Sequence, residues 1–265
     1  MKREATIYEK EDRVATITLN QPDRLNALGG RMSLELEQTL EEANADNEVG
    51  ALIITGVGKG FCSGADLSSL GSTTSEVERG LVSRSPAAGG IRSFALQLQN
   101  FEKPTIAAVN GAAVGAGLSL ALACDIRIAS DRARFSQIFI RRGLVPDTGS
   151  SYFLPRIVGM ERACEMVFTG DILDAERAKE YGLVSRVVPH DDLMREAREL
   201  AGRIAAGPAV AMKLAKRSLY RGEVSDLASA MEFEGYLQGI CFRTEDFKEG
   251  ISAFLEKREP EFKGR

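Results

Sequence analysis

Histidine is almost absent from this sequence, because only His190 occurs among the 265 residues. A Ser–His–Asp or Cys–His mechanism would depend on that one residue, and a metal site with several histidine ligands is excluded. His190 stands in VVPHDD, between a strand expected at Ser185–Val188 and a helix expected to begin at Asp191. A surface turn or a helix cap explains such a histidine better than catalysis does.

Paired cysteines and clustered basic residues are absent as well. The four cysteines are scattered without a C-x-x-C pair, which argues for a reducing compartment and against a disulfide framework or a zinc site. No run of Lys and Arg exceeds two residues, and 34 basic against 38 acidic residues leave a net charge of −4. Nucleic acid is therefore not an expected partner. The opening MKREATIYEKEDR lacks an apolar signal-peptide core, so the cytoplasm is the expected location.

One long segment without charge, Thr105–Cys124, raises the alternative of a membrane span. The segment is rich in alanine and is interrupted by Asn110-Gly111, Gly115 and Gly117. These residues favour a strand, a turn and a helix over a continuous apolar helix. No membrane partner is expected.

Strands and helices alternate along the first part of the chain. The sequence predicts a hairpin of Ala5–Lys10 and Val14–Leu19, a helix over Arg31–Asp46 that buries Leu34, Leu36 and Leu40, and strands at Ala51–Thr55, Thr105–Val109 and Asp125–Ala129. This alternation predicts an α/β fold with a largely parallel sheet.

The last third is expected to be helical throughout. Apolar residues recur at helical spacing in Asp191–Ala206, and helical segments continue to about Glu256. We therefore expect an α/β core over residues 1–200 and a helical region over 201–265. The Ser- and Gly-rich segment Gly71–Gly90 is interpreted as a mobile loop near a substrate entrance.

Two glycine-rich loops do not match nucleotide-binding motifs. In Gly56–Gly60, Lys59 is followed by Gly and not by Ser or Thr, and Gly115-Ala116-Gly117 lacks the third glycine of a dinucleotide fingerprint. Both loops instead place small residues directly after an apolar strand, where a ligand can approach the backbone. Two N–H groups aimed at one point would form an oxyanion hole. Tight packing turns are the alternative interpretation.

Five ordered motifs resemble the enoyl-CoA hydratase/isomerase (crotonase) superfamily, from about Thr6 to Gly264. They are NQPDRLNAL, KGFCSGADL, AAVNGAAVGAGLSLALACDIRIAS with the following ARFSQIFIRRGLVPDTGSSYFLPRIVG, FTGDILDAERAKEYGLV, and the tail ISAFLEKREPEFKG. The GLVPD segment and the tail look closest to the phenylacetyl-CoA-epoxide to oxepin isomerase and to Δ3,Δ2-enoyl-CoA isomerases.

The resemblance implies a spiral of αββ units with C-terminal helices that mediate trimerisation, often with two trimers stacked as a hexamer. It implies an acyl-CoA substrate, no separate cofactor, since coenzyme A is part of that substrate, and no metal. The backbone N–H groups of Ala65 and Ala116 are expected to hold the thioester oxygen. The residues expected to bind substrate are Arg24, Ala27, Ser63, Gly64, Asp66, Leu67, Gly115 and Phe139. Arg24 and Lys59 meet the phosphates of coenzyme A or are simply exposed charges.

The sequence departs from the pattern of the family's hydratases, which carry two glutamates. Ser119 and Phe139 stand at those positions. Adding water to an enoyl thioester needs one group that activates water and another that exchanges the α-proton. Phenylalanine can do neither, and serine without a base is a poor substitute, so a standard hydratase is disfavoured.

One carboxylate, Asp147 in GLVPDTGSS, lies where some relatives carry their only acid/base. A 1,3-proton shift needs a single proton shuttle, and an aspartate suits that role if Phe139, Leu144 and Val145 surround it and raise its pKa. The competing interpretation is an N-cap of a helix over Thr148–Val158.

We therefore expect an isomerase that acts on unsaturated or ring-derived acyl-CoA. The alternatives are a hydratase-type lyase that uses Asp147 and water, or a catalytically silent acyl-CoA-binding protein.

Overall fold

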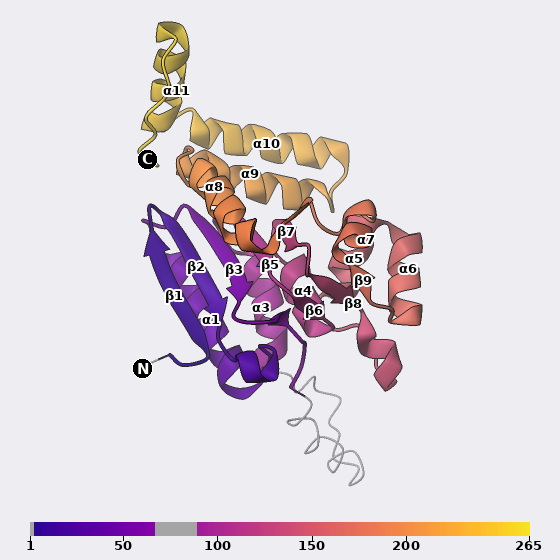
Figure 1. Ribbon diagram of the computed structural model, residues 1–265. Coiled ribbons are helices and arrows are strands. Elements are labelled where there is room, and N and C mark those ends of the chain that lie inside the picture. The colour runs from indigo at the N-terminus through magenta and orange to yellow at the C-terminus, as the bar shows by residue number, and fades with distance from the viewer. Residues whose placement is uncertain (1–2, 67–88) are drawn as a thin grey trace.

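The computed structural model describes residues 3–66 and 89–265, with side chains from residue 94 in the second range. Strands β1 (Thr6–Glu11) and β2 (Val14–Leu19) form the expected hairpin, in antiparallel register. From β2 the sheet continues in parallel through β3 (Ala51–Gly56), β5 (Thr105–Val109), β7 (Ile126–Ser130) and β10 (Arg186–Val188). Figure 1 shows this twisted sheet.

A second, smaller sheet has the order β4 (Gly60–Cys62), β6 (Ala112–Val114), β8 (Arg134–Ser136) and β9 (Leu173–Asp174). Each of its first three strands follows a strand of the large sheet, and a helix precedes each pair. These helices are α1 (Gly30–Ala45), α3 (Gly89–Gln99) and α4 (Ala116–Leu122). The expected α/β class and its αββ units are confirmed.

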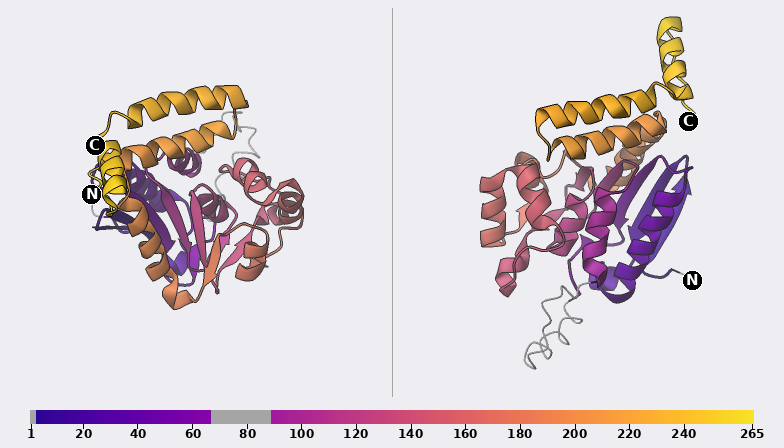
Figure 2. Two further views of the ribbon diagram at one scale, coloured as in Figure 1. Left: turned by 90° about the horizontal axis from the view of Figure 1, so that it is seen from above. Right: turned by 180° about the vertical axis from the view of Figure 1, so that it is seen from behind.

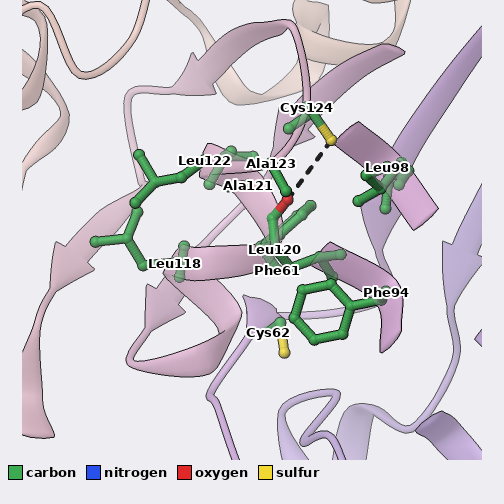
Figure 3. Packing of buried hydrophobic residues seen from close by; sticks show 14 of the residues in the cluster. Phe61, Cys62, Phe94, Leu98, Leu118, Leu120, Ala121, Leu122, Ala123 and Cys124 are labelled. Carbon is green, nitrogen blue, oxygen red and sulfur yellow. Dashed lines mark hydrogen bonds between the residues drawn. The ribbon is translucent and has the colours of Figure 1, made fainter. Parts of the chain in front are cut away.

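Helices cover both faces of the large sheet, and the apolar side chains of its strands pack against them on each face. Leu52 and Ile54 belong to the core cluster that also contains residues of α1 and α3, whereas Ala51 and Ile53 pack with residues of α8 (Leu193–Ala205). Successive side chains of a strand point to opposite faces, so a run that is apolar throughout is buried on both. Figure 3 shows Phe61, Phe94, Leu98 and Leu120 packed where β4, α3 and α4 meet.

One side-chain expectation for α1 is wrong. Leu36 and Leu40 are buried, but Leu34 is 52% exposed. Successive helical residues are separated by about 100°, so Leu34 lies on the face opposite Leu36. The buried stripe of α1 instead includes Met32 and Ala43.

Between the sheets and the C-terminal region lie short helices around the second sheet. They are η3 (Ile138–Arg142), α5 (Ser150–Val158), α6 (Met160–Thr169) and α7 (Ala175–Glu180). His190 begins a short 3-10 helix, η4 (His190–Asp192), and its Nδ1 lies 3.0 Å from the Ser130 hydroxyl.

The C-terminal region is helical, as expected. Helices α9 (Ala209–Gly222) and α10 (Leu227–Cys241) lie side by side, and α11 (Glu245–Glu256) projects away from the body in Figure 1 and in the right view of Figure 2. Residue 200 lies within α8, and the division of the chain at that residue stays a prediction.

The uncharged segment Thr105–Cys124 forms the expected strand (β5) and helix (α4), and between them the short strand β6, which the sequence did not predict. No helix within residues 3–66 and 89–265 is long and apolar enough to cross a bilayer. The loop expected at Gly71–Gly90 falls outside the described residues up to residue 88, and α3 begins at Gly89.

Candidate active site

Three strands of the second sheet end at one edge and bring the predicted site segments together. Strand β6 is parallel to both β4 and β8, and the carboxyl ends of neighbouring parallel strands lie at the same edge. The segments that follow these strands are Ser63–Asp66, Gly115–Gly117 and Gln137–Phe139.

The two neighbours of Ala65 form main-chain hydrogen bonds with Leu28. Leu28 N–H donates to the Gly64 carbonyl and Asp66 N–H donates to the Leu28 carbonyl, both at 2.7 Å. Since alternate residues of an extended chain direct their polar groups to opposite sides, Ala65 N–H points away from Leu28. In the described part of the chain it donates to no backbone carbonyl.

The Ala116 N–H lies beside that segment. Ala116 is the first residue of α4, preceded by Gly115 with a positive φ of +54°. An ideal Cβ built on Gly64 would lie 3.5 Å from the Ala116 nitrogen. Among the described residues, Ala116 N–H also has no backbone acceptor, as is usual at the first turn of a helix.

The two loops contact each other through their main chains, which requires glycine at position 117. A Cβ on Gly117 would lie 2.0 Å from the Cys62 carbonyl oxygen. Gly64 has φ of +95°, and its Cβ would lie 2.7 Å from the Val114 carbonyl oxygen. Small residues therefore allow the main chains of the two loops to lie in contact.

Cys62, which ends β4, is not available as a nucleophile. The side chain is fully buried, and burial raises the pKa of its thiol to about 12. At neutral pH the thiolate, which is the reactive species, is almost absent. Within residues 3–66 and 89–265, no three His, Cys, Asp or Glu residues are grouped so that they could hold a metal ion.

Ser119 and Phe139, which by the resemblance stand where hydratases carry glutamates, are both buried. Ser119 is 0% exposed, and its hydroxyl contacts the Ser150 hydroxyl at 2.7 Å and the main-chain carbonyl of Asp147 at 3.3 Å. The Phe139 ring lies against Gly115, since a Cβ built on Gly115 would be 3.7 Å from its Cζ. Phe139 therefore presents an apolar surface beside the Ala116 N–H.

Asp147 does not cap α5. The N-cap of that helix is Gly149, with no side-chain hydrogen bond, while Asp147 Oδ1 accepts a hydrogen bond from the Thr148 hydroxyl at 3.0 Å. The predicted start of the helix at Thr148 is also wrong, because Thr148 and Gly149 have φ of +49° and +87°. A β-branched residue in this conformation costs about 1–3 kcal/mol, so the rest of the structure holds the turn after Asp147.

The expected apolar enclosure of Asp147 is not formed by Leu144 and Val145. These side chains are 48% and 78% exposed, and Asp147 is itself exposed. The three residues lie in the irregular connection between η3 and α5, which runs over the surface. Phe139 is buried, with 7% of its surface exposed.

Arg24, one of the residues predicted to contact coenzyme A, contacts two residues of the segment that follows β4. Arg24 forms an ion pair with Asp66 at 2.7 Å, and Ser63 donates through its hydroxyl to the Arg24 carbonyl at 3.2 Å. Ala27 is buried and Lys59 is exposed. Leu67 lies outside the described residues.

An open basin of about 530 Å³ adjoins this ion pair. Its lining consists of Glu4, Gln21, Arg24, Gly29, Gly30, Arg31 and Asp66.

Sequence reasoning missed three residues that build the site. Asn26, fully buried with φ of +57°, donates to the carbonyls of Val57 and Gly60 and holds the β3–β4 turn. Its place in the NQPDRLNAL motif was a usable signal. Ser150 contacts the Ser119 hydroxyl and Gln137 contacts Ser150, and nothing in the local sequence marks either residue.

Comparison with known proteins assigns this arrangement to one family model. The model described as "Enoyl-CoA hydratase/isomerase" matches residues 9–265. The chain is 41% identical to the short-chain-enoyl-CoA hydratase of Clostridium acetobutylicum over 100% of both chains. It is 36% identical to the 1,2-epoxyphenylacetyl-CoA isomerase of Escherichia coli, over 96% of this chain and 97% of that protein.

Solved structures of enoyl-CoA hydratases have the same fold. A crystal structure of an enoyl-CoA hydratase from Bacillus anthracis superposes with a TM-score of 0.91 at 35% identity, covering 98% of this chain and 100% of that one. The two sheets and the C-terminal helices are therefore those of known enoyl-CoA hydratase structures.

Proposed function

The chain belongs to the enoyl-CoA hydratase/isomerase family, and on that premise we propose that it transfers protons next to the carbonyl of an acyl-CoA thioester through an enolate. The N–H groups of Ala65 and Ala116 hold the thioester oxygen. Preorganised donors of this kind stabilise the negative charge of the transition state, and loss of one typically costs about 3 kcal/mol.

Asp147 is the acid/base of the proposed reaction. Ser119 and Phe139 supply no carboxylate, whereas the main chain of Asp147 contacts the Ser119 hydroxyl. That contact is the observation that carries the proposal, because it sets a carboxylate-bearing residue next to a glutamate position of the hydratases. The exposed carboxylate is accessible to a substrate, and the bound acyl chain provides the desolvation that Leu144 and Val145 do not.

A single acid/base accounts for a 1,3-proton shift. Asp147 takes a proton from C2 of a 3-enoyl-CoA, and the C2–H electron pair forms the C2–C3 double bond of the product by way of a dienolate. The same aspartate returns the proton to C4, and the electron pair of the original C3–C4 double bond forms the new C4–H bond. Atoms and charge balance without water or a second acid.

Hydration is the second candidate, and it has support of its own. Similar proteins are mostly named as hydratases, including the relative that is 41% identical and the crotonyl-CoA hydratase of Syntrophomonas wolfei at 39% identity. These names favour hydration over isomerisation. In this alternative Asp147 activates a water that adds to C3 and then supplies the proton at C2.

The coenzyme A moiety is proposed to bind along Arg24, Ala27, Ser63, Gly64 and Asp66, with Gly115 and Phe139 lining the acyl end. The basin beside Arg24 opens to solvent, and a phosphate there would have both Arg24 and Arg31 within the same lining. Arginine recognises phosphate through paired N–H donors.

Oligomerisation through the C-terminal helices is also proposed. Large apolar side chains on α9, α10 and α11 are exposed, among them Leu219 (76%), Leu227 (76%) and Phe254 (80%). Apolar clusters of this kind mark protein interfaces. A homotrimer or hexamer would cover them, and light scattering should give a mass three or six times that of the chain.

Two thioesters separate the candidate functions. Purified protein is mixed with 3-enoyl-CoA and with crotonyl-CoA in separate cuvettes. Conversion of the first to the 2-enoyl thioester without hydration of the second supports isomerisation. Rapid hydration of crotonyl-CoA supports the second candidate, and binding without turnover of either indicates a silent acyl-CoA-binding protein.

The role of Asp147 is tested by Asp147→Asn, with Asp12→Asn as the control. Asp12 is an exposed aspartate in the β1–β2 turn, where asparagine also tolerates its left-handed backbone. Asp147→Asn should lower turnover by at least about a hundredfold while thioester affinity stays within a few-fold. Turnover that survives within a few-fold removes Asp147 from the mechanism.

A further inference from the structure

A row of buried polar side chains leads from the interior to the main chain of Asp147. Gln137, Ser150 and Ser119 are 0%, 1% and 0% exposed. The Gln137 amide lies 3.1 Å from the Ser150 hydroxyl, which lies 2.7 Å from the Ser119 hydroxyl. The Ser119 hydroxyl in turn lies 3.3 Å from the Asp147 carbonyl and 3.3 Å from the Gly115 carbonyl.

The hydrogens available in these side chains allow the row of hydrogen bonds to be donated in either of two directions. Each hydroxyl has one hydrogen to donate. If the Gln137 oxygen faces Ser150, Ser150 donates to Gln137 and Ser119 donates to Ser150. No hydrogen then remains for the Asp147 carbonyl, and the Gln137 Nε2 is buried without a partner in the described structure.

Turning the Gln137 amide by 180° reverses the row. Its Nε2 then donates to Ser150, Ser150 donates to Ser119, and the single hydroxyl hydrogen of Ser119 is shared between the carbonyls of Asp147 and Gly115. Amide oxygen and nitrogen have nearly the same shape, so their assignment rests on the hydrogen bonds that each makes. A buried N–H without a partner is rarer than an under-used carbonyl oxygen, which favours the turned amide.

We propose that Gln137, Ser150 and Ser119 form a one-way hydrogen-bond chain that fixes the main chain of Asp147 and so aims its carboxylate. Asp147 needs such support because the next residue, Thr148, has the unfavourable φ of +49°. The three are positioning residues and do not touch substrate. The inference rests on the proposed acid/base role of Asp147. It gives Ser119, at a glutamate position of the hydratases, the role of holding the main chain of Asp147.

The effect of interrupting this hydrogen-bond chain is tested with Ser119→Ala and Gln137→Met. Activity is measured with the thioester that the parent protein turns over. Both variants should lower kcat by about ten- to a hundredfold, since small misplacement of a reacting group has effects of this size, and should leave KM within about twofold. Ser130→Ala is the control, because Ser130 is also 0% exposed and its hydroxyl contacts His190, on the other sheet. It should lose stability but keep kcat.

The direction in which the hydrogen bonds run, from Gln137 to Asp147, is tested with Gln137→Glu. A protonated glutamic acid donates one hydrogen to Ser150 and preserves the chain, whereas an ionised glutamate only accepts and reverses it. The ratio of its kcat to that of the parent should therefore fall as pH rises from about 5.5 to about 9, a range that includes the raised pKa of a buried glutamate.

The outcomes separate this inference from the proposed function. Full kcat in both Ser119→Ala and Gln137→Met overturns the support, and a kcat ratio for Gln137→Glu that does not fall with pH overturns its direction. If Asp147→Asn is inactive while Ser119→Ala is fully active, only the support fails. If Asp147→Asn is active, the proposed function fails.

Discussion

The Ser119 hydroxyl lies 3.3 Å from the main-chain carbonyl oxygen of Asp147. This contact joins α4 to the connection before α5 and places the candidate acid/base beside a residue that replaces a hydratase glutamate. In the proposed site, two backbone donors act together with this one carboxylate, and the buried polar residues behind Asp147 position it.

Gly117→Ala should separate the two loops of the site. The added Cβ would lie 2.0 Å from the Cys62 carbonyl oxygen, and because both partners are main chain, the backbone must move. We expect a loss of about 3 kcal/mol in the free energy of unfolding, measured by urea denaturation, and a large loss of turnover. Gly202→Ala is the control in α8, with open space at its Cβ, and should be about 0.5–1 kcal/mol more stable. Equal stability of the two variants would contradict the close approach of the loops.

Lys216→Met should weaken the attachment of α9 to the core. The Lys216 side chain is 7% exposed and pairs with Asp125 at 2.8 Å, and its removal leaves a largely buried carboxylate without its cation. We expect a loss of about 3 kcal/mol in the free energy of unfolding. Arg177→Gln, which breaks an exposed pair with Glu180, should hardly change the melting temperature. A melting temperature equally unaffected by Lys216→Met would show that the buried pair adds nothing.

Thiol labelling at about pH 8 should spare Cys62. Burial raises the pKa of this thiol to about 12, so only about one molecule in ten thousand carries the thiolate. The same holds for Cys124, whose pKa is also raised to about 12 by burial. Iodoacetamide followed by peptide mass mapping should label these two cysteines only in denaturant, with turnover retained in the native protein. Rapid native labelling of Cys62 would contradict the closed packing behind the site.

The fold could be predicted from sequence wherever an element has clear local limits. β5 lies at the predicted Thr105–Val109, because Pro104 and Asn110-Gly111 bound an apolar run. The predicted burial of Leu34 was wrong because the prediction rested on residue type and not on the direction in which each side chain points around α1.

The site could be predicted only in part. The resemblance to the family singled out Ala65, Ala116 and Asp147 as candidates, since these residues lie within the matching motifs. They could not show that Leu144 and Val145 leave Asp147 exposed, because burial depends on which elements pack over a loop. Ser150 was missed for the same reason, since its partner Ser119 is distant in sequence and meets it only in the folded chain.

Exchange of the α-proton tests the central claim most directly, because enolate formation requires only the two N–H donors and one acid/base. Butyryl-CoA, a saturated thioester that can be neither isomerised nor hydrated, is incubated with the protein in D2O and followed by mass spectrometry. We predict deuterium at C2 with the parent protein and with Asp12→Asn, and none above background with Asp147→Asn. Deuterium that appears equally fast with Asp147→Asn, or not at all with the parent, would contradict an enolate formed by Asp147.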